Sequence, residues 1–266
     1  MLFIGPAGYP PGSADVVDAV RRVHGLGLNA LEVQFVRNVQ MAEGKAHDAR
    51  LLAERLGVRL SAHAPYYISL SSPAAETVAK SREWILRAAR AAHALGAWIV
   101  VVHAASYTGA PSAAVTEKVV MELTKCREVL DMERNPVVIG LETMGKKGQW
   151  GTIDEIHEVM GRVKGVQPVV DFAHIHARGG GSLRGEEDFQ AVFDRYDARP
   201  TARIHCHFSG IEFTGAGERN HLPLSSNSPD YAPLRNILNK RNEDITLICE
   251  TPDPSKDAGI MRVRLV

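Results

Sequence analysis

Val169-Val-Asp171-Phe-Ala-His174-Ile-His176 is a β-branched apolar run that ends in a carboxylate, with a histidine three positions later. This pattern is typical of a buried strand that delivers polar side chains to the edge of a sheet. Alone it is a weak signal, because an Asp after a strand often caps the next helix. Five more apolar runs end in the same way, at His63, His103, Glu142, His205 and Glu250. Six such strand ends indicate a common site.

The composition sets broad limits on fold and function. The chain has 266 residues, of which 45% are hydrophobic and 23% are charged, as in ordinary globular proteins. Its 31 basic and 31 acidic residues balance, so no global field favours nucleic acid or membrane binding. We find no apolar run of the ~18 residues that a transmembrane helix needs, and no secretion signal. Three cysteines without a CxxC spacing favour reduced thiols and a cytoplasmic location.

Strand and helix patterns alternate along the whole chain. Strands are expected at residues 2–5, 30–34, 58–63, 98–103, 137–142, 169–171, 203–207 and 245–250. Helices are expected at residues 13–24, 47–56, 73–95, 112–132, 152–161, 187–196 and 233–240, while the final stretch, 257–266, is short. Eight alternations predict an α/β fold, a (β/α)8 TIM barrel that forms one domain over residues 1–266, with its final helix short or missing.

In such a barrel the carboxyl ends of the strands build the active site. The imidazoles and carboxylates named above would then converge on one volume, where unpaired charges would repel one another. Divalent cations resolve this conflict, and mixed imidazole and carboxylate ligands suit zinc, manganese or iron. His207 shares a strand face with His205, so we expect a supporting or substrate-binding role for it. His176 is left open, and His221 lies in a polar loop where a surface histidine is the default.

The ordered motifs resemble the endonuclease IV family of apurinic/apyrimidinic (AP) endonucleases, within the xylose-isomerase-like TIM barrel superfamily. The matching stretches are Ala62-His63-Ala-Pro-Tyr66, Val102-His103, Gly140-Leu-Glu142-Thr, Val170-Asp171-Phe-Ala-His174, His205-Cys-His-Phe-Ser209, Glu218-Arg-Asn-His221 and Cys249-Glu250-Thr-Pro252. Each motif is weak alone, but the ordered set is specific and covers nearly the whole barrel.

The resemblance implies up to three Zn²⁺ ions per chain, with Mn²⁺ as an alternative. His63 and His103 would hold one ion, and Glu142 would bridge it to a second ion. Asp171, His205 and Glu250 would complete that second site. His174, His221 and a carboxylate would hold the third ion. The family shows Asp-x-His at this last point, whereas Arg219 stands two residues before His221 here. Glu218 is the nearest carboxylate, and it reaches the site only if the loop carries an extra residue.

The implied reaction is hydrolysis of DNA 5′ to an abasic site, leaving 3′-hydroxyl and 5′-deoxyribose phosphate ends. Two ions bridged by Glu142, the expected catalytic residue, would generate a hydroxide that attacks the phosphorus in line. Extruding a sugar that lacks its base costs less than extruding a stacked nucleotide. The expected partner is double-stranded DNA with abasic sites, contacted by Tyr66 and Arg37. No membrane partner is expected, and a monomer is the default for a closed barrel.

Two other functions remain open. A sugar isomerase or epimerase of the same barrel class would use Glu142, Asp171, His205 and Glu250 around one metal. It does not need histidines at positions 63, 103 and 221, which favour the nuclease. A catalytically idle barrel is the second alternative, because the usual Asp near His221 is missing.

Overall fold

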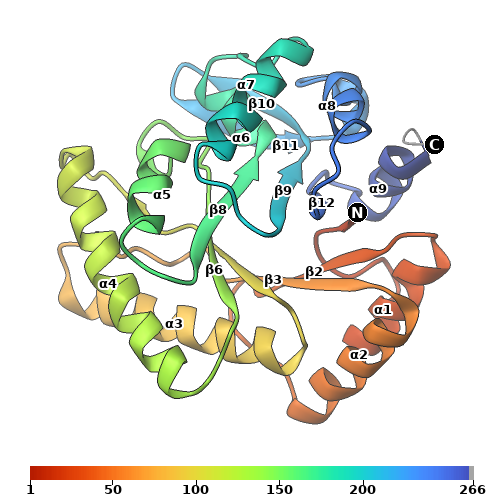
Figure 1. The fold of residues 1–266 in the computed structure, drawn as a ribbon, viewed down its shortest axis with the longest axis horizontal. Helices are drawn as coiled ribbons and strands as arrows, with labels where there is room; N and C mark the ends of the chain where they lie inside the picture. The colour runs from red at the N-terminus through yellow and green to blue at the C-terminus, as the bar shows by residue number, and fades with distance from the viewer. Residues whose placement is uncertain (264–266) are drawn as a thin grey trace.

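The structure, a computed structural model, describes residues 1–263 and is built around one sheet of eight parallel strands (Figure 1). The strands are β1 (Leu2–Pro6), β2 (Ala30–Gln34), β3 (Arg59–His63), β4 (Ile99–Val102), β6 (Val138–Glu142), β8 (Val166–Asp171), β9 (Ile204–Phe208) and β12 (Ile245–Cys249). Their order in the sheet is β1-β12-β9-β8-β6-β4-β3-β2. The predicted TIM barrel is therefore confirmed.

The barrel closes where β1 meets β2, and this seam has few hydrogen bonds. Gly8 N donates to Glu32 O at 2.9 Å, and Asn29 N donates to Ile4 O at 3.1 Å. Gly5 allows the close approach of the two strands, because a Cβ at this position would lie 1.7 Å from Ala30 O. The seam brings the carboxyl end of β2, and with it Glu32, to the same mouth as the other strands.

Helices surround the strands on the outside of the barrel (Figure 1). They are α1 (Val16–Gly25), α2 (Glu43–Leu56), α3 (Ala75–Ala94), α4 (Ser112–Met132), α5 (Ile153–Met160), α7 (Glu186–Asp197), α8 (Tyr231–Leu238) and α9 (Pro254–Val263). Their apolar faces bury most of the core against the strands. The final helix, α9, which the sequence predicts to be short or missing, is present with 10 described residues, more than the 8 of α5 or α8. The end of its predicted range, residues 264–266, lies outside the described part of the chain.

Several short elements that the sequence patterns did not predict lie in the loops at the carboxyl ends of the strands. They are β5 (Ala105–Ser106), β7 (Gln149–Trp150), α6 (Phe172–Arg178), β10 (Gly210–Thr214), β11 (Gly217–Leu222) and the 3-10 helix η1 (Leu224–Ser226). The β10–β11 hairpin reaches towards the loop after β6, where Lys146 pairs with Gly217. These elements line one mouth of the barrel and place further side chains there.

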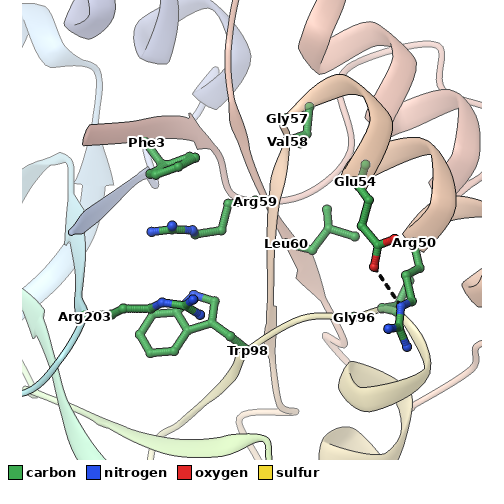
Figure 2. A pocket seen from close by; sticks show the side chains of 12 residues that line it. Phe3, Arg50, Glu54, Gly57, Val58, Arg59, Leu60, Gly96, Trp98 and Arg203 are labelled. Atoms are coloured by element: carbon green, nitrogen blue, oxygen red, sulfur yellow. Dashed lines mark hydrogen bonds and ion pairs between the residues drawn. The ribbon is translucent and has the colours of Figure 1, made fainter. Parts of the chain in front are cut away.

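Arginines and aromatic rings close the opposite mouth (Figure 2). The Arg59 guanidinium lies 3.6 Å from the Phe3 ring centroid and donates two hydrogen bonds to the Asp244 carboxylate, at 2.5 and 3.0 Å. Arg203 lies over Trp98, 5.6 Å from its ring centroid. A cavity of about 220 Å³ remains at this end. Its arginine charges are matched by carboxylates, so the cavity has none of the features of a metal site.

Among the described residues, no helix is both long and apolar enough to cross a membrane.

Candidate metal centre

The inward-facing side chains change from apolar to ionisable along the barrel axis. Ile99, Val101 and Val169 form an apolar cluster between β4 and β8. Gly140 leaves room for it, since a Cβ there would lie 2.6 Å from Val169 Cγ2. Because side chains alternate along a strand, Asp171 follows Val169 on the same inward face. Imidazoles and carboxylates therefore collect at the carboxyl ends of the strands.

The first ligand group contains His63, His103 and Glu142, whose ligand atoms lie within 4.8 Å of one another. The Nε2 atoms of His63 and His103 lie 3.2 and 2.7 Å from Glu142 Oε2. His63 and Glu142 are buried, and His103 is half-buried. The structure thus brings together the residues expected at the first ion.

The second group contains Glu142, Asp171, His207 and Glu250. His207 Nδ1 lies 3.4 Å from Glu142 Oε1, 4.0 Å from Asp171 Oδ2 and 3.5 Å from Glu250 Oε2. The structure does not bring His205 into this group, although the resemblance assigned it there. In the sheet, His207 is level with Asp171, whereas His205 is level with Val169 and so lies one layer deeper. His207, expected only in a supporting role, takes the place of His205 in this group.

The third group contains His174, Glu218 and His221. In the β10–β11 hairpin, Glu212 pairs with Asn220 and Phe213 pairs with Glu218, so Arg219 is the extra residue of a β-bulge. The bulge supplies the extra residue that Glu218 needs to reach the site. Glu218 Oε2 lies 3.5 Å from His174 Nε2, while Arg219 contacts Glu212 on the exposed side of the hairpin. His221 belongs to this group and is not a free surface histidine.

Backbone carbonyls orient three of these imidazoles. His63 Nδ1 lies 2.7 Å from Ala64 O, His174 Nδ1 lies 2.9 Å from Thr143 O, and His221 Nδ1 lies 2.8 Å from Glu250 O. A carbonyl only accepts, so each Nδ1 carries a proton, and each Nε2 offers a lone pair when the imidazole is neutral. Imidazoles that ligate metals are commonly held in this way.

The electrostatics of the site match a centre that holds cations. Burial on its own lowers the pKa of His207, but Glu250, Glu32 and Glu142 outweigh it and raise this pKa well above its ordinary value. The pKa values of His63 and His174 are raised as well, because neighbouring carboxylates, Glu142 among them, outweigh burial. Burial raises the pKa of Glu250, whereas His103 and His207 lower the pKa of Glu142 against its burial. Protons on imidazoles and divalent cations would compete for the same positions.

Buried polar atoms that lack a hydrogen bond support the same interpretation. Glu142 Oε1, Asp171 Oδ2 and His207 Nδ1 are buried, and none of them makes a hydrogen bond with any of the described residues. Such atoms are costly unless a ligand satisfies them. Nitrogen and oxygen donors in this number fit zinc, with manganese as an alternative. The residues therefore fit the metal ions that the sequence predicted.

A cavity of about 680 Å³ opens above the three groups. Its lining includes His63, His103, Lys146 and the aromatic ring of Tyr66. Tyr66 is 49% exposed, and its ring centroid lies 6.5 Å from that of His63. Arg37 is exposed and near enough to Tyr66 to lower its pKa, which burial and Glu250 raise overall. Both residues expected to contact DNA thus lie at the rim of the site.

Glu32, on β2, is a residue of the site that the sequence analysis missed. It is fully buried and forms a group with His205 and His207. Burial would raise its pKa, but the two histidines lower it well below the ordinary value. Burial also lowers the pKa of His205, which favours a neutral imidazole there. A lone carboxylate inside the apolar run of residues 30–34 was the available signal.

Sequence comparisons identify relatives of the whole chain. The sequence model described as "Xylose isomerase-like TIM barrel" matches residues 20–263. An uncharacterized protein of Methanocaldococcus jannaschii is 30% identical over 98% of this chain and 96% of its own length. The probable endonuclease 4 of Symbiobacterium thermophilum is 31% identical over 88% of each chain. The resemblance to endonuclease IV seen in the motifs is confirmed.

Solved structures show the same fold. Endonuclease IV from Thermus thermophilus superposes with a TM-score of 0.77 at 20% identity, covering 99% of this chain and 98% of that chain. A D-tagatose 3-epimerase-like protein superposes with a TM-score of 0.73 at 17% identity, covering 98% and 95% of the two chains. Nucleases and epimerases therefore share this architecture, and the choice between them depends on the site.

Proposed function

Because this chain belongs to the xylose isomerase-like TIM barrel family, with endonuclease 4 proteins among its relatives, we propose that it is a metal-dependent endonuclease acting at abasic sites in DNA. The observation that carries the proposal is that three ligand groups meet in one mouth of the barrel, with Glu142 belonging to two of them. A hydrolase that handles a phosphodiester needs several positive charges near one phosphate, and adjoining cation sites provide them.

Each group would hold one ion, and zinc suits the donors best. The first ion would be held by His63, His103 and Glu142. The second would be held by Glu142 again, with Asp171, His207 and Glu250. The third would be held by His174, Glu218 and His221. When bound, the ions would withdraw electron density from the phosphodiester and lower the pKa of a nearby water. Glu142 keeps the first two groups adjacent, which makes it the proposed catalytic residue.

The rim residues fit a damaged duplex as the substrate. Tyr66 offers an exposed aromatic face beside the ligand groups, and Arg37 and Lys146 offer positive charge near the cavity. We propose that Tyr66 and Arg37 contact the DNA around the abasic nucleotide. Extruding a sugar that lacks its base from the duplex costs less than extruding a stacked nucleotide, so the cavity would admit it selectively. Cleavage 5′ to this sugar would leave 3′-hydroxyl and 5′-deoxyribose phosphate ends.

An epimerase is the competing function, because Glu142, Asp171, His207 and Glu250 alone would form a one-metal site. Such a site does not use the surrounding imidazoles. Two pairs of additional imidazoles lie close to carboxylates here: His63 and His103 are near Glu142, and His174 and His221 are near Glu218. These additional ligands favour several ions.

The test uses a synthetic duplex with one abasic analogue and the purified protein loaded with zinc. We expect a nick 5′ to the analogue that a chelator abolishes and zinc restores, while the matched intact duplex stays whole. Atomic emission spectroscopy of the purified protein should find about three metal ions per chain. One ion per chain together with an uncut abasic duplex would reject the nuclease in favour of the epimerase.

A further inference from the structure

Glu32 lies one layer below the proposed metal ligands, in contact with two of the imidazoles. Its neighbour across the sheet is Ser61, and the next inward position on that strand is His63. Glu32, His205 and His207 are all fully buried. The lining of the 680 Å³ cavity includes His63 and Glu250 but none of these three residues. Glu32 therefore contacts His207 from the interior of the barrel and does not face the substrate cavity.

Four polar groups point at the Glu32 carboxylate. Ser61 Oγ donates to Oε2 at 3.0 Å, and Gln34 Nε2 donates to Oε1 at 2.9 Å. His205 Nε2 lies 2.9 Å from Oε2, and His207 Nε2 lies 3.3 Å from it. An ionised carboxylate only accepts hydrogen bonds, and it has room for about four. This environment suits an anion, with the proton of each imidazole on Nε2.

The bond to Glu32 determines how His207 presents itself to the cluster. When His207 is neutral, a proton on Nε2 leaves the lone pair of Nδ1 facing the carboxylates of Glu142, Asp171 and Glu250, where a metal ion would take it. The other oriented imidazoles, His63, His174 and His221, donate to backbone carbonyls. His207 differs from them because its second nitrogen meets a carboxylate that belongs to none of the first three ligand groups, and charge-assisted bonds are about twice as strong as neutral ones.

We propose that Glu32 is a positioning residue that fixes the ring orientation and tautomer of His207, and so sets the metal affinity of the group formed with Glu142, Asp171 and Glu250. His205 holds Glu32 in place from the inner side. The inference rests on the metal sites of the proposed function, but not on the reaction at DNA.

A fourth ion between Glu32, His205 and His207 is the rival interpretation, since these residues also form a possible ligand group. That ion would take His207 Nε2 while Nδ1 serves the neighbouring group, so one neutral imidazole could not satisfy both. The four donors around Glu32 already occupy its acceptor sites, and the group has no exposed surface. The positioning role is therefore favoured.

The experiment measures zinc affinity without DNA, by competition with a chromophoric chelator, in wild-type protein, Glu32→Gln, Glu32→Asp and Ser61→Ala. Glu32→Gln keeps the side-chain shape and removes the charge. We expect one ion to bind about 10- to 100-fold more weakly, as is usual when a carboxylate partner of a ligating histidine is lost. Ser61→Ala is the matched control, because it removes one donor to Glu32 and leaves the bond to His207, and its affinity should stay near wild type.

Cobalt-loaded protein provides a readout that a purely structural role would not move. The visible absorption of Co²⁺ should change in Glu32→Gln and stay as in wild type in Ser61→Ala, while circular dichroism shows the same folded chain. Should Glu32→Gln fail to fold, Glu32→Asp decides, because its shorter carboxylate keeps the charge but moves away from His207. Unchanged affinity and absorption in the folded variant would overturn the proposal.

Two further outcomes are distinct. Four ions in wild type and three unperturbed ions in Glu32→Gln would overturn the proposal in favour of a metal site at Glu32. Weaker zinc binding in Glu32→Gln, in a wild-type protein that binds zinc but does not nick DNA, would support the positioning role and reject only the nuclease function.

Discussion

Replacing Glu142 with glutamine tests the carboxylate that two ligand groups share. Glu142 is buried, and its Oε2 lies 2.7 Å from His103 Nε2 and 3.2 Å from His63 Nε2. Each charge-assisted hydrogen bond contributes about 1.5–3 kcal/mol. Glutamine fills the same volume and spares the desolvation of a charge, so we expect a net loss of about 2–4 kcal/mol. Domains commonly have about 5–15 kcal/mol of stability, so the variant should remain folded.

Catalysis should suffer more than folding. Glu142→Gln removes an anionic ligand from both groups at once, and bound divalent ions contribute several kcal/mol to charge stabilisation in hydrolysis. A loss of about 4 kcal/mol corresponds to about 10³-fold in rate. The assay is nicking of the abasic duplex under single-turnover conditions, together with metal content and circular dichroism. The control is Glu212→Gln, a partly exposed carboxylate on the β10–β11 hairpin. A folded Glu142→Gln that nicks at the wild-type rate would refute the bridging role.

Three other predictions concern separate parts of the site. Tyr66→Ala should raise the concentration of abasic duplex needed for half-maximal nicking, with metal content unchanged; a loss of zinc in this variant would mean that the ring supports the ligands. Glu218→Gln should release about one ion per chain and leave the others bound, as measured by emission spectroscopy; full metal content with wild-type affinity would remove Glu218 from the ligand set. Zinc binding near neutral pH should release up to about three protons per chain, because the pKa values of His63, His174 and His207 are raised and each must lose its extra proton to bind metal. Proton release should decline as the pH rises through those raised pKa values, and calorimetry in buffers of different ionisation enthalpy measures it; pH-independent binding enthalpies with no buffer effect would contradict the raised values.

The barrel could be predicted because each repeat carries its own local signals. Apolar runs such as residues 97–102 are bounded by glycine or polar residues, and the helices between them keep a 3.6-residue period. Strand β11 of the β10–β11 hairpin has no such signal. Its residues Glu218-Arg-Asn-His221 are all polar, so this strand does not alternate, and its pairing with β10 depends on contacts across the hairpin. The short helix α6 was not predicted for a different reason. Asp171 is both the last residue of β8 and the N-cap of α6, so no loop residues separate the two elements.

The sequence predicted most residues of the site, but not how far along the barrel axis each one lies. A two-residue period identifies the face of a strand, so His205 and His207 were known to point the same way. Which of them reaches Asp171 depends on the stagger between β8 and β9, a property of two strands far apart in sequence. Glu32 was missed for a related reason. It precedes the end of its strand by two residues, and only barrel closure brings it beneath His207.

The bulge at Arg219 has a consequence for comparing distant members of this family. Deleting Arg219 would leave Glu218 two positions before His221. This is the acid-x-His spacing that the family shows and that Arg219 interrupts here. A one-residue insertion in a hairpin can therefore shift a ligand in an alignment without shifting it in space. Searches that demand a fixed interval between acid and histidine would discard proteins like this one, whereas searches that allow the hairpin to absorb the extra residue would retain them.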